Sequence, residues 1–172
     1  VPIHNMKNAD SFLIRLLKSL EKQTFRDFEI VITKDGLMAK NTNSAISKAA
    51  GEIIKILYMD DWLESPDYLM EIYKAFLNPE IDWLITAALN NRHPMWTDDI
   101  ETGNNRLGSP SALAFRNNRE DNLLFDENLS WLLDCDLCKR MERKFGKPAI
   151  LTDVLIGIGE HAGQMTHILT DE

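Results

Sequence analysis

The chain has 172 residues, of which 44% are hydrophobic, and this length and composition suit one globular domain with a hydrophobic core. Its 27 acidic and 19 basic residues give a net charge of −8, which argues against nucleic acid or an anionic lipid surface as a partner. No apolar run reaches the roughly 18 residues that span a bilayer, and no stretch resembles a signal peptide. We therefore expect a cytoplasmic protein with no transmembrane segment.

The first part of the chain alternates between extended and helical patterns. After an extended start at residues 1–4, leucines and phenylalanine recur at helical spacing over residues 9–23, which predicts an amphipathic helix. Residues 28–33 are rich in β-branched side chains and end in the turn signal KDG, so they predict a strand. A second helix is expected at residues 38–50, and Gly51 ends it.

The same alternation continues to the middle of the chain. Residues 52–59 form a largely apolar run, which is typical of a strand buried on both faces of a parallel sheet. A helix follows, with Ser65 as its N-cap and Pro66 at its first position. Residues 82–90 predict another strand. This succession indicates an α/β fold with a mostly parallel central sheet flanked by helices.

The second half of the sequence is less regular. The polar stretch from residue 90 to residue 109 is expected to be a long functional loop. Residues 112–116 predict a short strand, and residues 129–146 predict a helix that ends at a glycine. Residues 149–169 predict one or two strands, interrupted near Gly159.

Two cysteines, Cys135 and Cys138, lie inside the last predicted helix. They form an isolated CxxC, and no second pair completes a zinc site. Because they do not lie at a helix start, where a thiolate would be stabilised, they do not indicate a redox centre.

Polar side chains follow three successive predicted strands, and they are His4 with Asn5, then Asp35, then the adjacent Asp60 and Asp61. In doubly wound sheets, ligands bind beyond the carboxyl ends of the strands, so we expect these side chains to share one edge. The adjacent carboxylates repel each other unless something compensates their charge. Either they hold a divalent cation, or they favour the positive end of the helix that follows.

Five segments in this order resemble the nucleotide-sugar-dependent glycosyltransferases of family 2: VPIHN (1–5), SLEKQTFRDFEIVITKDG (19–36), NTNSAISKAAGEIIKILYMDDWL (41–63), LGSPSALAFR (107–116) and FDENLSWLLDCDLCKRM (125–141). The resemblance implies a single GT-A fold domain over residues 1–172. Its nucleotide-sugar-binding half would be residues 1–90, and its acceptor and catalytic half residues 91–172.

The same resemblance implies an inverting transferase. Such an enzyme moves a sugar from a nucleoside-diphosphate sugar, with a UDP-sugar as the first choice, to a hydroxyl of a saccharide or another acceptor. It usually requires Mg²⁺ or Mn²⁺. A divalent cation held by carboxylates neutralises the negative charge that develops on the leaving diphosphate.

The resemblance also assigns the donor-nucleotide contacts. Pro2, His4 and Asn5 match the first-strand element that lines the nucleotide pocket, and Asp35 matches the aspartate that contacts the base. Asn43 matches an asparagine of the helix that follows. An ordinary turn explains Asp35 equally well, and the polarity of a helix surface explains Asn43 almost as well.

For the cation, the resemblance places Asp60 and Asp61 at the position of the family's metal-binding acidic motif. Asp61 is the first-choice metal ligand and Asp60 the ribose contact, and the two roles are exchangeable. His161 matches a C-terminal histidine that completes metal or diphosphate binding.

An inverting reaction needs a base that takes the proton of the acceptor hydroxyl, and the resemblance assigns this role to Asp134. A solvated helix face is the competing explanation for Asp134 and Asp136. Trp131 lies one turn earlier and offers a ring for sugar stacking, although a tryptophan of the core is the commoner case. Gly108 and Ser109 match the loop beneath the acceptor site.

Four positions depart from the family pattern, and they are Lys34, Thr42, Tyr58 and Leu133. These departures favour, as the alternative, a noncatalytic module that binds a nucleotide sugar. A nucleotidyltransferase is a weaker hypothesis, because it would need a glycine-rich phosphate loop after the first strand and residues 1–10 contain no glycine.

Overall fold

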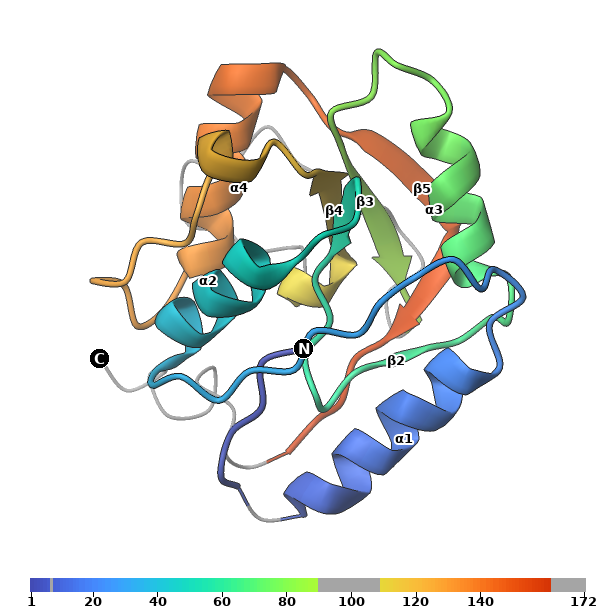
Figure 1. The fold of residues 1–172 in the computed structure, drawn as a ribbon, viewed down its shortest axis with the longest axis vertical. Helices are drawn as coiled ribbons and strands as arrows, with labels where there is room; N and C mark the ends of the chain where they lie inside the picture. Colours follow the sequence, from blue (N-terminus) through green and yellow to red (C-terminus); the bar gives the residue numbers. More distant parts are fainter. Residues whose placement is uncertain (7, 90–108, 162–172) are drawn as a thin grey trace.

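The computed structural model describes residues 1–6, 8–89 and 109–161 (Figure 1). In chain order its elements are α1 (Ala9–Glu21), α2 (Met38–Lys48), β1 (Ile53–Lys55), β2 (Trp62–Leu63), α3 (Tyr68–Phe76), β3 (Trp83–Ala88), the 3-10 turn η2 (Pro110–Ala112), β4 (Leu113–Arg116), the 3-10 turn η3 (Arg119–Asp121), α4 (Leu133–Phe145) and β5 (Ala149–Gly157). Strands and helices mix along the chain, which confirms the α/β class.

The five strands form one sheet in the order β1-β4-β3-β5-β2. Only β3 and β5 pair in parallel, whereas β1 with β4, β3 with β4 and β2 with β5 pair antiparallel. The sheet is thus only partly parallel, which corrects the expectation of a mostly parallel one. A buried strand carries the same apolar run in either direction, so the pattern of residues 112–116 did not reveal that β4 runs against both of its neighbours.

The predicted strand at residues 28–33 is extended but does not join this sheet. It pairs with the start of the chain through an isolated parallel bridge between Pro2 and Thr33. A cavity of about 510 Å³ separates the segment from β1, and Ile30 and Ile32 stay 43% and 45% exposed. The prediction of a strand here is therefore wrong, because among the described residues the β-branched run lacks a neighbouring strand to pair with beyond the single bridge at Thr33.

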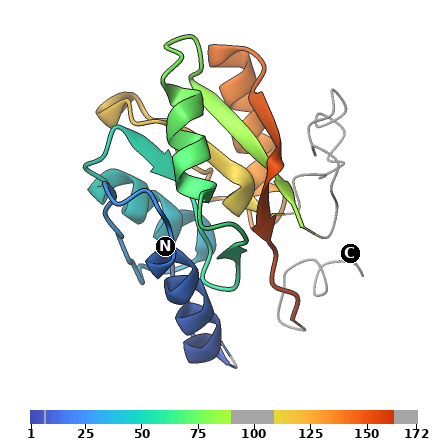
Figure 2. The same cartoon turned by 90° about the vertical axis from the view of Figure 1, so that its right-hand side faces the viewer.

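The helices cover the sheet from different sides. Figures 1 and 2 show α3 and α4 on opposite faces of the sheet, and α1 beside β2. The apolar side chains between these layers form one buried cluster. Its most deeply buried members include Leu16, Trp83, Leu84, Ile85, Leu113 and Leu137.

The predicted helices all form, with shifted ends. Helix α3 begins at Tyr68, two residues after Pro66, and the Ser65 hydroxyl accepts a hydrogen bond from the main-chain N–H of Asp67 at 3.1 Å. Helix α4 begins only at Leu133, because the preceding Leu132 adopts a left-handed conformation with φ of 55°. It ends at Gly146, as expected.

The pairing of β2 with β5 brings the Trp62 ring unusually close to the backbone of Gly157. Gly157 lies opposite Trp62 in this ladder, and a Cβ atom at Gly157 would lie 2.0 Å from Cε2 of the indole ring. Real Cβ atoms do not approach a ring so closely. Position 157 therefore needs glycine, because any larger residue would collide with the Trp62 ring. The glycine allows β5 to pair with β2, directly after the turn that carries the acidic pair.

We expect Gly157→Ala to lower the free energy of unfolding by about 1–3 kcal/mol, because the added methyl group overpacks the contact with the Trp62 ring. Urea denaturation at neutral pH measures this loss. Gly51→Ala is the matched control, because the nearest atom to its Cβ would be the Ile53 carbonyl oxygen at 3.6 Å. Equal losses in the two variants would contradict this account of the close packing.

Candidate functional site

A cavity of about 380 Å³ collects most of the predicted site residues. Those that line it are Pro2, His4, Asn5, Asp60, Asp61, Ser109, Trp131, Asp134 and His161. They come from five separate parts of the chain, so only the fold brings them together. The larger cavity beside β1 shares Pro2 with this set but none of its acids or histidines. The smaller cavity is therefore the candidate site.

Asp60 and His161 form a close pair in this cavity. His161 Nε2 lies 3.2 Å from Asp60 Oδ2, and both side chains are more than four-fifths buried. The ring of Phe12 on α1 packs against the imidazole, with 5.5 Å between the ring centroids. The structure thus joins two of the three predicted metal-binding side chains.

Asp61, the third, points away from solvent and is only 1% exposed. Its Oδ2 accepts a hydrogen bond from the Ser109 hydroxyl at 2.7 Å, and its Oδ1 accepts one from the Gly159 N–H at 3.0 Å. Burial, followed by the charge of Asp60, raises the pKa of Asp61 above its usual range. The carboxylate therefore connects the chain before η2 to the segment that carries His161.

His4 contributes an imidazole to the same cavity. Its main-chain N–H donates to the sulfur of Met59 at 3.2 Å, and its Nε2 atom is buried with no hydrogen-bond partner among the described residues. Burial lowers the pKa of His4, and the nearby Asp60 opposes this only in part. A neutral ring with an unused nitrogen is suited to a hydrogen bond with a ligand.

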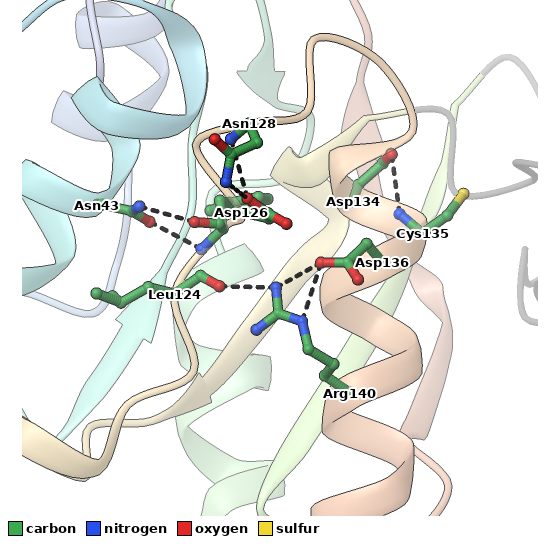
Figure 3. Close-up of polar contacts among 9 residues, drawn as sticks. Asn43, Leu124, Asp126, Asn128, Asp134, Cys135, Asp136 and Arg140 are labelled. Carbon is green, nitrogen blue, oxygen red and sulfur yellow. Dashed lines mark hydrogen bonds and ion pairs between the residues drawn. The ribbon is translucent and has the colours of Figure 1, made fainter.

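Asp35 and Asn43 do not line the cavity. The Asp35 carboxylate is turned toward α2, where it accepts hydrogen bonds from the Ser44 hydroxyl and, at 3.0 Å, from Lys48 Nζ. Asn43 is buried, and its amide both donates to the Phe125 carbonyl at 2.9 Å and accepts from the Phe125 N–H at 2.8 Å (Figure 3). Asn43 thus holds the chain that leads toward α4.

Asn41, which the sequence analysis did not single out, organises the predicted nucleotide side of the cavity. Its Oδ1 accepts from the Asp35 N–H at 2.9 Å, and its Nδ2 donates to the Ile3 carbonyl at 3.0 Å. Its own carbonyl accepts from the Thr33 hydroxyl at 3.0 Å. Asn41 is one of two asparagines in a short helix, and nothing in the sequence distinguished its role from that of Asn43.

Asp134 and Trp131 lie where α4 begins. Asp134 is buried at the second position of the helix, and its Oδ1 accepts from the Cys135 N–H at 3.0 Å (Figure 3). Trp131 is 41% exposed, so its ring is a wall of the cavity and not part of the core. A buried carboxylate and an accessible aromatic ring therefore face one space.

Asp136 behaves differently from its neighbour on the same helix. It forms an ion pair with Arg140, with 2.6 Å between Nη2 and Oδ2, and the same guanidinium donates to the Leu124 carbonyl at 2.8 Å (Figure 3). Asp136 therefore stabilises a loop. The predicted acceptor residue Gly108, and the predicted long loop up to residue 108, lie outside the described residues.

A buried amine lies behind the acidic turn. Lys55 on β1 donates hydrogen bonds to the carbonyls of Ser111 and, at 3.3 Å, Leu113. Burial lowers the pKa of Lys55 to about 7, although the charge of Asp61 works in the opposite direction. The sequence signal was a single lysine in an otherwise apolar strand, and its importance was missed.

Tyr58 is one of the four positions at which the sequence departs from the pattern of the family it resembles. Its N–H donates to the Ser111 hydroxyl at 2.8 Å, and its own hydroxyl lies 3.4 Å from the Thr42 hydroxyl. Burial raises the pKa of Tyr58 far above its usual range, so the phenol is neutral. Tyr58 therefore lines the cavity as a polar but uncharged group.

The described part of the chain contains no cluster of three or more His, Cys, Asp or Glu side chains arranged to hold a metal ion. Among the described residues, Asp60 and His161 are a close pair of side chains of the types that bind metals, 3.2 Å apart. Cys135 and Cys138 are buried free thiols, and burial raises the pKa of both.

Comparisons with known proteins identify the fold. No family model and no curated protein sequence matches the chain significantly. Among solved structures, residues 1–349 of S. aureus TarS in complex with UDP superimpose with a TM-score of 0.73 at 19% identity, over 94% of this chain and 59% of that chain. The complex of the same TarS chain with UDP-GlcNAc gives 0.73 at 20% identity, over 95% and 58%.

TarS is a glycosyltransferase of the GT-A-like fold. The longer crystallised TarS chain also matches, with a TM-score of 0.71 at 18% identity, over 94% of this chain and 36% of that one. This chain thus spans less than two thirds of the length of each of these TarS chains. At these identities the likeness establishes the fold, which is the GT-A type expected from the sequence. None of the described helices is long and apolar enough to cross a bilayer.

The buried amine leads to a prediction about pH. Because the pKa of Lys55 is lower in the folded than in the unfolded chain, the unfolded chain binds the proton more tightly and stability rises with pH above 7. We expect Lys55→Met to remove roughly 2–3 kcal/mol of this rise between pH 7 and 9.5. Urea denaturation at both pH values measures it. The exposed Lys144→Met is the control, and identical pH dependence in the parent and Lys55→Met would refute the prediction.

Proposed function

We propose that this chain is a glycosyltransferase module that binds a nucleoside-diphosphate sugar in the 380 Å³ cavity. The observation that carries the proposal is the assembly of His4, Asp60, Trp131, Asp134 and His161 in one space. His4 suits a contact with the nucleotide, and Asp60 with His161 suits a cation. Trp131 suits a sugar ring, and Asp134 suits a general base. The shared fold with TarS, which binds UDP and UDP-GlcNAc, supports a uridine nucleotide as the first donor to test.

Asp60 and His161 are the residues proposed to hold Mn²⁺ or Mg²⁺. Their side chains are 3.2 Å apart in the cavity, and Asp61, whose two oxygens accept hydrogen bonds from Ser109 and Gly159, supports them from behind. Of the two exchangeable roles assigned from the sequence, this geometry favours Asp60 as the ligand. Two protein ligands leave positions for diphosphate oxygens and water. When bound, the cation would neutralise charge on the departing diphosphate.

The nucleoside is proposed to lie between the start of the chain and the turn before α2. Pro2, His4 and Asn5 form one wall of this space, and the unused Nε2 of His4 offers a hydrogen bond to the base or ribose. A contact from Asp35 would require its carboxylate to leave Ser44 and Lys48. Asn43 would act only indirectly, through its hold on the backbone of residue 125.

The acceptor is proposed to bind on the other side, against Trp131 and Ser109. An exposed aromatic ring stacks on the apolar face of a sugar, and a saccharide is the acceptor that this wall suits best. Asp134 is the proposed general base, because it is the carboxylate at the cavity wall beside Trp131. Inversion, membership of family 2 and a cytoplasmic location belong to the same proposal and rest on the sequence.

A thermal-shift panel tests donor binding. We expect UDP with Mn²⁺ to raise the melting temperature more than GDP, CDP or dTDP, because the shared fold with TarS favours a uridine nucleotide. A ligand at 100 times its Kd stabilises the folded chain by about 2.7 kcal/mol. Asp60→Asn should remove the Mn²⁺-dependent part of the shift. Asp153→Asn, at an exposed position on β5, removes the same negative charge but should behave like the parent. If no nucleotide stabilises the parent, the proposed function is wrong.

Asp134→Asn tests the catalytic role. We expect transfer or donor hydrolysis to fall about 10²–10⁴-fold while the UDP-dependent thermal shift is unchanged, because a general base acts only when the acceptor attacks. Release of UDP from UDP-GlcNAc with a panel of saccharides measures it, with Asp153→Asn as the control. If the parent binds donor but transfers no sugar, the noncatalytic binding module is the better description.

A further inference from the structure

One face of α1 holds the turn that carries the acidic pair. Phe12, Arg15 and Ser19 follow each other at spacings of three and four residues, so they project from the same side of the helix. The Ser19 hydroxyl accepts from the Leu63 N–H at 3.1 Å, and Arg15 Nη2 donates to the main-chain carbonyl of Asp60. Helix α1 thus forms hydrogen bonds with both ends of the turn, at Asp60 and at Leu63.

The Arg15 guanidinium is held in place by rings as well as by this hydrogen bond. Its Cζ lies 4.0 Å from the centroid of the Trp62 ring and 5.5 Å from that of Phe12. A planar guanidinium stacks on aromatic faces in a way that an ammonium does not. Its Nε is buried without a hydrogen-bond partner among the described residues, so stacking and the bond to Asp60 define its position.

The C-terminal segment packs against the same carbonyl and against Arg15. A Cβ atom at Gly159 would lie 2.1 Å from the Asp60 carbonyl oxygen and 2.9 Å from Arg15 Nη2. The segment can therefore approach only because residue 159 is glycine. The Gly159 N–H donates to Asp61, and the His161 ring two residues later lies between Phe12 and Asp60.

We propose that Arg15 is a positioning residue that sets the distance between Asp60 and His161. Its hydrogen bond goes to the main-chain carbonyl of Asp60 and leaves the carboxylate to His161 and a cation. Its charge compensates the two adjacent acids without neutralising the ligand atoms themselves. The proposal deepens the proposed function, because the pair it positions is the proposed cation site.

The positioning is tested first without any ligand. In the parent, NMR should place the His161 ring protons in the ring current of Phe12, with cross-relaxation between the two rings. We expect Arg15→Met to shift these resonances and weaken the cross-relaxation, and Arg15→Lys to restore them only in part. Arg119→Met is the matched control, because Arg119 also donates to main-chain carbonyls, those of Ala49 and Ala50, but outside the cavity.

Gly159→Ala is a second variant that disturbs the contact between Asp60 and His161, in this case from the C-terminal segment instead of from α1. It should move the His161 resonances as Arg15→Met does, although it leaves the charge unchanged. Spectra are compared at temperatures equally far below each variant's melting temperature, so that lost stability alone does not produce the effect. Unchanged His161 resonances in Arg15→Met would overturn the positioning role.

The second test measures Mn²⁺ affinity in the presence of UDP, by electron paramagnetic resonance of free Mn²⁺. We expect Arg15→Met to weaken Mn²⁺ binding by about 10–100-fold, as residues that orient metal ligands commonly do, and Arg119→Met to leave it unchanged. UDP binding without metal should change by less than about twofold, since Arg15 is absent from the residues lining the cavity. Parental Mn²⁺ affinity in Arg15→Met would count against the proposal. If the parent itself binds no Mn²⁺, the proposed cation site fails, and the NMR comparison alone decides the role of Arg15.

Discussion

The site depends on the docking of the acidic turn against the C-terminal segment. β2 and β5 pair over only two residues, one of which sets Gly157 against the Trp62 ring, and just beyond this ladder the Gly159 N–H donates to Asp61. Ser109 joins from the other direction by donating to Asp61. Because these contacts tie together segments from the middle and the end of the chain, the cavity exists only when both are in place.

The acidic and basic groups near this contact lie in different surroundings. Asp61 is buried and satisfied by neutral donors, while Asp60 keeps its carboxylate in the cavity beside His161. The buried Lys55 and the stacked Arg15 lie on the protein side of the turn. Desolvating two adjacent acids is costly, and the Arg15 guanidinium lies beside the turn without covering the carboxylate of Asp60.

The shape of the cavity depends on residues behind its walls as well as on the residues that line it. Asn41 holds the first segment to the turn before α2, and Asn43 holds the chain that leads to α4. Each amide donates to one main-chain carbonyl and accepts from one main-chain N–H, and Asn43 also donates to the Glu127 carboxylate at 3.1 Å, which is how a buried polar side chain avoids the penalty of burial. Two of the segments around the cavity are thus held by one helix, α2, through residues two positions apart on the chain.

The amino-acid sequence by itself determined the four described helices and, in outline, the strands β1, β3, β4 and β5, because apolar periodicity and turn residues are local signals. It also placed the acidic pair after an apolar run and His161 beyond β5, but β1 itself ends at Lys55, and only the structure put Asp134 at the start of α4. Tertiary structure alone decided that β4 runs antiparallel, that residues 28–33 stay outside the sheet, and that Asp35 turns toward Lys48. The roles of Asn41, Lys55 and Arg15 were likewise hidden, since a hydrogen bond or a stacked ring depends on partners distant in the chain, and no local pattern records which partner will be near.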